Sequence, residues 1–228
     1  MSFPLTTKVA LGSLASCSVV GGGILMGSNF FGKDQEKTSL SSLMKTKNPE
    51  KRLISRSVSG SDATWKAAWK RYLDSNSNVW ALTIGTAKKD GNDEAPAAFL
   101  NKCAENSDAL IENERDPLYS QVLSYCTRDT LIKDLISESG SRRFLDGTSG
   151  KDTAEWKAAW EAYKSKNTNK EDKQDKWSLS DWKDKHSQGE ALDSFKNKCT
   201  EKSSINAYSQ SSLVEDYGLV LDWCTIKV

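Results

Sequence analysis

Apolar residues recur along the chain at the spacing of helices that bury one face. Trp65, Trp69 and Tyr72 stand at i, i+4 and i+7, which places them on one side of a helix. Phe99 and Cys103 stand at i and i+4. A further set with helical spacing consists of Tyr119, Val122, Leu123 and Cys126. The pattern predicts about three helices with aromatic side chains directed inward.

The same three patterns return in the second half of the chain, in the same order. WKAAWKRY at Trp65 returns as WKAAWEAY at Trp156, AFLNKC returns as SFKNKC, and LYSQVLSYC returns as DYGLVLDWC. The offsets are 91, 96 and 98 residues, so the second copy contains insertions, one of them the charged run Lys164–Lys176. Such repetition indicates a duplicated unit, in which Trp177 is the expected counterpart of Trp80.

The predicted fold is therefore mainly α, with two tandem homologous modules of about three helices each. The first is expected over residues 61–137 and the second over 152–228. The last helix of the first module is expected to continue through Leu131, Ile132, Leu135 and Ile136. Residues 138–151 are expected to be the linker, because 138–150 contain three Gly and three Ser. VWALTIG (79–85) suits a strand, but its periodicity does not decide the matter.

Residues 1–32 differ from the rest in having a long uncharged run. Val9–Gly32 is 24 residues without charge, and about 20 mostly apolar residues cross a bilayer as a helix. We therefore predict a transmembrane anchor or signal segment over 1–32, with a buried core helix as the weaker interpretation. In an alternative, LASC (14–17) resembles a bacterial lipobox, and Cys17 is lipidated.

Residues 33–60 are polar and predict a disordered stalk between anchor and modules. Six of these 28 residues are Ser, and Lys/Arg outnumber Asp/Glu seven to three. Such a segment buries too little apolar surface to offset its ordering entropy. A second interpretation lays this basic strip on anionic lipid headgroups. The same positive charges favour a cytoplasmic location for the residues after the span, but long domains translocate across the membrane largely regardless of charge.

Four of the five cysteines occur as two per copy, each ending a matched helical pattern. If the copies fold alike, the expected disulfides are Cys103–Cys126 and Cys199–Cys224. Such bonds occur in oxidising compartments, so they favour a location outside the cytoplasm. The alternatives are buried free thiols, a zinc site and a catalytic thiol. The absence of C-x-x-C and the single His disfavour a zinc site. The only histidine, His186, lies in a Lys/Asp-rich surface stretch of one copy only, which disfavours a catalytic thiol.

Composition and motifs exclude several classes of function. The net charge is +1, from 32 Lys+Arg and 31 Asp+Glu, without the basic excess typical of nucleic-acid binding. Phosphate-binding, nucleophile-elbow, zinc-protease and EF-hand motifs are absent from the sequence. Carboxylates are scattered among lysines, and no acid/base pair stands out. Tryptophans can stack on sugars, but at helical spacing they more often form the core. We predict no catalytic residue, no metal and no cofactor.

Together these features resemble a known group of proteins. An apolar N-terminus, a polar stalk, W-K-x-A-W-x-x-Y, F-x-N-K-C and a closing W-C are similar to paralogous families of small membrane-associated surface proteins in hemotropic mycoplasmas. The resemblance covers most of the chain after residue 60. It implies membrane association, surface display and expansion by duplication. The family has no established activity, and the resemblance supplies no functional residues to carry over. Because hemotropic mycoplasmas lack a cell wall, a tethered domain would face the host directly.

The expected function is that of a membrane-tethered surface protein, acting by binding or antigenic display. It would be held at the cell membrane by a single span or a lipid anchor, with the modules outside. Its expected partners are the membrane and a host or cell-surface protein, and not nucleic acid. One alternative is a tethered hydrolase with a site between the modules, around His186. The other is a cytoplasm-facing scaffold with four reduced thiols.

Overall fold

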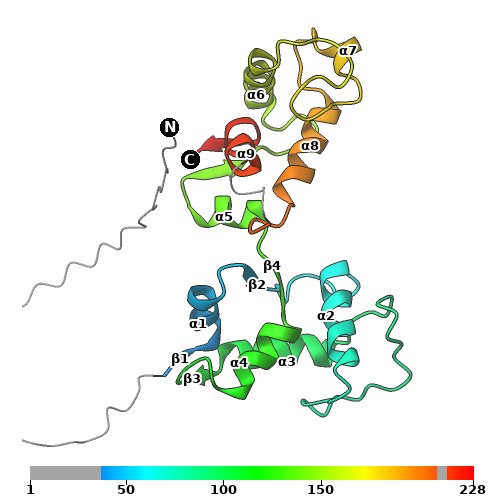
Figure 1. Ribbon diagram of the computed structural model, residues 1–228, viewed down its shortest axis with the longest axis vertical. Helices are drawn as coiled ribbons and strands as arrows, with labels where there is room; N and C mark the ends of the chain where they lie inside the picture. The colour runs from blue at the N-terminus through cyan, green and yellow to red at the C-terminus, as the bar shows by residue number, and fades with distance from the viewer. Residues whose placement is uncertain (1–36, 210–214) are drawn as a thin grey trace, which may run out of the picture. The chain divides into compact units, whose positions relative to one another are not determined.

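The computed structural model describes residues 37–209 and 215–228. The predicted anchor over 1–32, Cys17 and residues 33–36 of the predicted stalk lie outside the described residues. No helix in the described part of the chain has both the length and the apolar character that a membrane span needs. Helices dominate there, which confirms the predicted mainly α class, and two-stranded antiparallel sheets accompany them (Figure 1).

The described residues form two hydrophobic cores, each built from consecutive elements (Figure 1). The elements of the first core are β1 (Thr38–Ser39), α1 (Leu40–Lys47), β2 (Lys51–Leu53), α2 (Ala63–Asp74), α3 (Ala97–Asp108), β3 (Leu110–Ile111), α4 (Pro117–Tyr125) and β4 (Thr127–Asp129). The elements of the second core are α5 (Ile132–Glu138), β5 (Arg142–Phe144), α6 (Thr153–Lys166), α7 (Trp182–Lys185), α8 (Asp193–Ser203), α9 (Tyr217–Cys224) and β6 (Thr225–Lys227).

Capping residues in the sequence mark where two helices of the first core begin. The Asp62 carboxylate accepts a hydrogen bond from the Thr64 amide at 2.8 Å, which caps the free end of α2. Asp116 caps α4 in the same way, and Pro117 occupies the first position, where its missing N–H costs nothing. These caps set the helix registers that turn the aromatic residues inward.

A phenylalanine stands at the centre of each core. Phe99 on α3 is fully buried and contacts the rings of four residues: Trp65, Trp69, Tyr72 and Trp80. Phe195 on α8 is also fully buried, and its four ring neighbours are Trp156, Trp160, Tyr163 and Trp177. The eight tryptophans are thus largely committed to core packing, and Trp177 occupies the place of Trp80, as the sequence predicts.

Short antiparallel ladders close each core. β1 pairs with β3, and β2 pairs with β4. In the second core β5 pairs with β6. An isolated bridge between Leu131 and Asn206 lies where the β1–β3 ladder would stand, because the Ile132 amide donates to the Ile205 carbonyl as the Leu40 amide donates to the Ala109 carbonyl. The bridge thus lies at the start of the second core, as the β1–β3 ladder lies at the start of the first.

The prediction of a disordered stalk is wrong for residues 37–60. Ser39 caps α1, whose buried face presents Leu40 and Met44 at i and i+4 to the first core. Ile54, just after β2, is buried in the same core. Three apolar side chains buried in one core are enough to order a segment whose average composition is polar, because burial depends on position and not on composition.

The predicted linker and the end of the predicted first module are also wrong. Ile132 and Ile136 belong to α5, which packs into the second core and does not prolong α4. Within the expected linker, β5 forms a ladder with β6, and Leu145 is buried. β4 therefore leads into α5, the first helix of the second core, after only two residues, Thr130 and Leu131. Residues 79–85 form turns and irregular backbone and no strand.

Candidate binding site

A disulfide lies at the edge of each core. Cys103 on α3 bonds to Cys126 at the end of α4, and Cys199 on α8 bonds to Cys224 at the end of α9, with Cα–Cα distances of 5.5 and 5.6 Å. These are the pairs expected from the sequence. The sulfur atoms are buried, so each bond ties two helices together without presenting a reactive thiol.

A cavity of about 600 Å³ opens beside the Cys199–Cys224 bond. One wall is apolar and consists of Phe144, Leu145 and Trp156. The polar part of the lining comes mainly from α8. Its side chains are Asp193, Lys196, Asn197, Thr200 and Ser203, followed by Ser204, with Lys133 of α5 and Gly147 completing the rim. The cavity therefore joins a flat apolar surface to a row of hydrogen-bonding groups.

A smaller cavity of about 160 Å³ lies in the same place beside Cys103–Cys126. Most of its lining matches that of the larger cavity, with Leu53, Ile54 and Trp65 in place of Phe144, Leu145 and Trp156. Lys133, Asp193 and Asn197 of the larger cavity have no counterpart in the lining of the smaller one. Along the helix, Leu100, Ala104 and Ser107 replace Lys196, Thr200 and Ser203. On the rim, Arg56 stands where the second core has Gly147.

Glycine at position 147 contributes no side chain to the lining of the larger cavity. A Cβ atom at this position would meet no atom within 4 Å, so the backbone does not require glycine for lack of space.

Lys196 Nζ lies 3.8 Å from Asp193 Oδ1 and 6.0 Å from the centroid of the Trp156 ring, an arrangement that holds the ammonium near the apolar wall. The cavity thus keeps a cation next to a ring surface.

A second hollow, of about 760 Å³, runs along α2 and β4. Arg71 crosses it and donates hydrogen bonds to the carbonyl oxygens of Ser124 and Thr127 at 2.8 and 2.5 Å. The Ser124 carbonyl belongs to the last turn of α4 and the Thr127 carbonyl to β4, so the guanidinium ties the end of α4 to the following strand. Ala162 stands at the matching position of α6, and this contact is specific to the first core.

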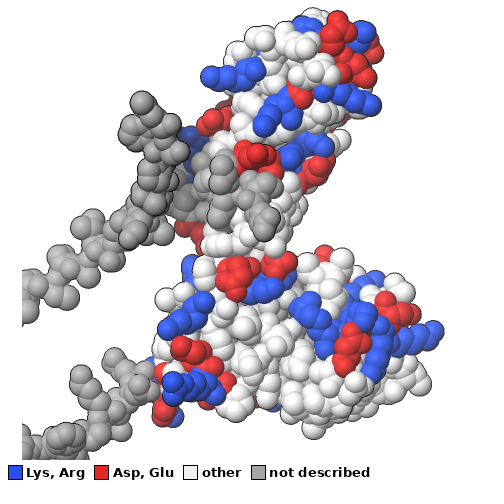
Figure 2. Space-filling model, in the orientation of Figure 1, with Lys and Arg blue, Asp and Glu red and all other residues white. Residues whose placement is uncertain are grey.

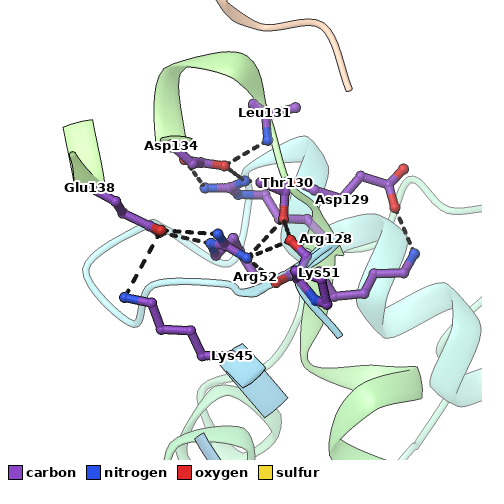
Figure 3. Close-up of polar contacts among 10 residues, drawn as sticks. Lys45, Lys51, Arg52, Arg128, Asp129, Thr130, Leu131, Asp134 and Glu138 are labelled. Atoms are coloured by element: carbon purple, nitrogen blue, oxygen red, sulfur yellow. Dashed lines mark hydrogen bonds and ion pairs between the residues drawn. The ribbon is translucent and has the colours of Figure 1, made fainter. Parts of the chain in front are cut away.

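Ion pairs join the first core to α5 at the junction drawn in Figure 3. The Arg52 guanidinium donates to both Glu138 carboxylate oxygens at 2.8 and 3.0 Å and to the Thr130 hydroxyl at 3.0 Å (Figure 3). Lys45 approaches Glu138 at 4.0 Å. The hydrogen bond to Glu138 holds the pKa of Arg52 above its usual value. Elsewhere on the face in Figure 2, basic and acidic side chains are interspersed.

Asp134 anchors the start of α5 in the same network. It accepts from Arg128 at 2.6 and 2.9 Å and from the Leu131 amide at 2.8 Å (Figure 3). Burial opposes its ionisation, but the hydrogen bonds from Arg128 and Leu131 outweigh burial and lower its pKa below 3.8. A carboxyl group whose folded pKa is depressed stabilises the fold above its unfolded pKa and loses this effect as the pH falls through the folded value.

We expect Asp134→Asn to show this dependence on pH. At pH 7 the variant should lose about 1 kcal/mol of unfolding free energy, allowing for solvent screening of a partly exposed pair. At pH 2, below the ordinary carboxyl pKa of 3.8, the difference should become smaller as protonation of Asp134 removes the effect. Urea unfolding of both proteins at the two pH values measures it. A difference of equal size at both would show that the ionised form of Asp134 does not stabilise the fold.

Each core contains a buried tyrosine that organises the following loop. The Tyr72 hydroxyl donates to Asn78 Oδ1 at 2.8 Å and accepts from the Trp80 amide at 3.0 Å. Tyr163 makes the matching contacts with the Asp175 carboxylate and the Trp177 amide. Burial first, and then the hydrogen bond to Asp175, raise the pKa of Tyr163. The hydroxyl therefore stays protonated and acts as a structural donor.

The indole N–H groups of the matched tryptophans differ. Trp80 Nε1 donates to Gln121 Oε1 at 2.8 Å, whereas Trp177 Nε1 is buried without a partner among the described residues. The position equivalent to Gln121 carries Leu219. Replacing an acceptor with leucine at this position accounts for the unpaired donor.

We expect Leu219→Gln to supply the missing acceptor. The variant should gain about 1 kcal/mol of unfolding free energy, because a buried donor without a partner costs about 1–3 kcal/mol, and Leu219 is only partly buried. Leu219→Met, similar in length but without the amide, is the control and should show no gain. Thermal and urea unfolding measure both, and equal stability of the two variants would contradict this assignment.

His186, the residue around which a hydrolytic site was the alternative expectation, lies just after α7. Its Nδ1 is within 3.0 and 3.1 Å of the carbonyl oxygens of Trp182 and Lys183, and its ring lies 5.5 Å from that of Trp182. It does not line either of the two disulfide cavities. The contacts that His186 makes are thus with its own helical turn.

Comparison with protein-family models, with curated proteins and with solved structures finds no significant match to this chain.

Proposed function

We propose that this chain is a membrane-tethered binding protein made of two homologous modules, displayed outside the cytoplasm. The N-terminal apolar run supplies the tether, and the modules comprise residues 38–129 and 130–227. These boundaries follow the two cores and replace those expected from the sequence. The resemblance to surface proteins of hemotropic mycoplasmas agrees with this location. The observation that carries the proposal is the matched, buried disulfide in each core.

Equivalent hydrogen bonds support the duplication. Trp65 Nε1 donates to the Ser55 carbonyl at 3.2 Å, and Trp156 Nε1 donates to the Asp146 carbonyl at 2.8 Å. In each case the acceptor stands ten residues before the tryptophan. The Ile54 amide donates to the Cys126 carbonyl, and the Leu145 amide donates to the Cys224 carbonyl, at 2.9 and 3.0 Å. Contacts that depend on exact register do not recur by chance in two unrelated small folds.

The disulfides support an outside location. Bonds of this kind form and persist in oxidising compartments and are rare where thiols are kept reduced. A unit of about 90 residues has a thin core, so such a bond makes a large relative contribution to its stability. A role in binding is supported by the two cavities, which share one framework but differ in size and chemistry.

Protease treatment of intact cells tests the location. The full chain would carry a C-terminal epitope, and added protease is expected to remove it without breaking the cells. A maleimide of high mass should label Cys103, Cys126, Cys199 and Cys224 only after denaturation and reduction. A cytoplasmic marker protein controls for cell integrity. A protected epitope together with four thiols that react without reductant would overturn the proposal in favour of the cytoplasm-facing scaffold.

A further inference from the structure

We propose that the cavity beside Cys199–Cys224 binds a small organic anion with a planar apolar body, such as an aromatic carboxylate. The inference rests on the binding role proposed above and names its ligand class. The volume of about 600 Å³ lies within the usual range of small-molecule sites, whereas the matching cavity of about 160 Å³ lies below it. Of the two cavities beside the disulfides, only the one in the second core therefore has room for such a ligand.

The charge of the lining selects an anion. The larger cavity has two lysines, Lys133 and Lys196, and one acid, Asp193, which leaves one excess positive charge. The smaller cavity has one arginine and one acid, Arg56 and Asp108, and is balanced. The Asp193 side chain is 94% exposed and lies 3.8 Å from Lys196, so this weak pair leaves the ammonium available.

The walls select a flat apolar body with polar groups along one edge. Trp156 and Phe144 line one side of the cavity. Lys196 and Thr200 stand one turn apart on the α8 side, at i and i+4. The Thr200 and Ser203 hydroxyls donate to carbonyl oxygens of their own helix at 3.4 and 3.0 Å, and each oxygen keeps the capacity to accept. A carboxylate at Lys196 would place an attached ring against Trp156.

Three differences between the cavities bear on room and polarity. Where the smaller cavity has Arg56, Leu100 and Ala104, the larger one has Gly147, Lys196 and Thr200. The first removes a side chain from the rim, and the other two replace apolar groups with a cation and a hydroxyl. The framework of the disulfide and tryptophan is kept, so these changes alter the site and leave the fold intact.

Ligand-observed NMR tests the site with two probes that differ only in charge. Indole-3-acetate and neutral indole-3-acetamide would be titrated against the oxidised full chain in lipid nanodiscs, with empty nanodiscs as the blank. The wild-type protein is expected to bind the acetate about five-fold more tightly, the effect of one partly exposed ion pair. Absence of binding, or equal affinity for both probes, overturns the proposal.

Four variants locate the site. Lys196→Leu, the residue of the other core, should remove the preference for the acetate and leave the affinity for the amide within two-fold. Asp193→Ala should strengthen acetate binding about two-fold by freeing Lys196. Gly147→Leu should weaken both probes at least five-fold by filling the rim. Leu100→Lys in the first core is the control and should change neither. A preference that survives Lys196→Leu places the anion elsewhere and overturns the proposal.

This experiment is independent of the location test. It uses purified protein, so its result does not depend on which side of a membrane the modules occupy. Protease accessibility in turn does not depend on the cavity. A failure of either proposal is therefore recognised separately.

Discussion

Phe195→Ala is expected to lower the free energy of unfolding by about 3–5 kcal/mol, a larger effect than that of Asp134→Asn or Leu219→Gln. The side chain is fully buried on α8 and contacts four aromatic rings, from Trp156, Trp160, Tyr163 and Trp177. Truncation removes these contacts and leaves a cavity that α6 and α8 cannot close without moving the disulfide that ties α8 to α9. Urea unfolding followed by tryptophan fluorescence measures the loss.

Phe99→Ala provides the matched variant in the first core. Its ring has four equivalent neighbours, and the same loss of about 3–5 kcal/mol is expected. Tyr208→Ala is the control, because this ring is 42% exposed and its removal should change stability by no more than about 0.5 kcal/mol. Losses below about 1 kcal/mol in both phenylalanine variants would contradict the assignment of these residues as the centres of the two cores.

Removal of the Cys199–Cys224 bond is expected to cost roughly 3 kcal/mol. The bond closes a loop between residues 25 positions apart, and in the chain-entropy description a loop of this size restricts the unfolded state by about that amount. The Cys199→Ser, Cys224→Ser double variant avoids leaving an unpaired thiol. Urea unfolding without reductant measures the difference from the wild-type protein.

The Cys103→Ser, Cys126→Ser variant tests the equivalent bond, and a similar loss is expected for a separation of 23 positions. Reductant supplies the internal control: it should destabilise the wild-type protein and either double variant, but not a variant that lacks all four cysteines. If the double variants unfolded at the same urea concentration as the oxidised wild-type protein, neither bond would contribute to stability.

The sequence predicts the helical character, the core aromatics and the disulfide pairs, because each of these leaves a local signal. Trp65, Trp69 and Tyr72 repeat at the helical period, and the cysteines end matched phrases. The location of Trp177 follows from the same alignment of copies. These predictions require only that two similar segments fold in the same way.

The boundaries of the two cores could not be predicted from these phrases. α1 and α5 occupy equivalent places, yet they share only an apolar pattern, with Leu40 and Met44 in one and Ile132 and Ile136 in the other. Their polar residues differ, and Ser-rich sequence around α1 has the composition of a disordered segment. The two buried residues of the eight-residue helix α1 stabilise it by packing against residues that lie far away in the sequence.

The cavities beside the disulfides could not be predicted from the sequence alone either. Position by position, the substitutions of Leu100 by Lys196 and Ala104 by Thr200 are visible in the aligned phrases. Without the fold, they read as ordinary changes on a solvated helix face. Only the fold, which places α8 near β5 and Trp156, shows that both residues line one cavity.

The short separation within each cysteine pair affects the order in which the bonds can form. A chain that emerges from its amino end presents Cys103 and Cys126 before any residue of α5 appears. The first pair can therefore oxidise while its only possible partners among these four cysteines are each other. Cys199 and Cys224 then meet with neither thiol of the first pair left to compete. Vectorial synthesis thus selects the native connectivity from the three that four cysteines allow.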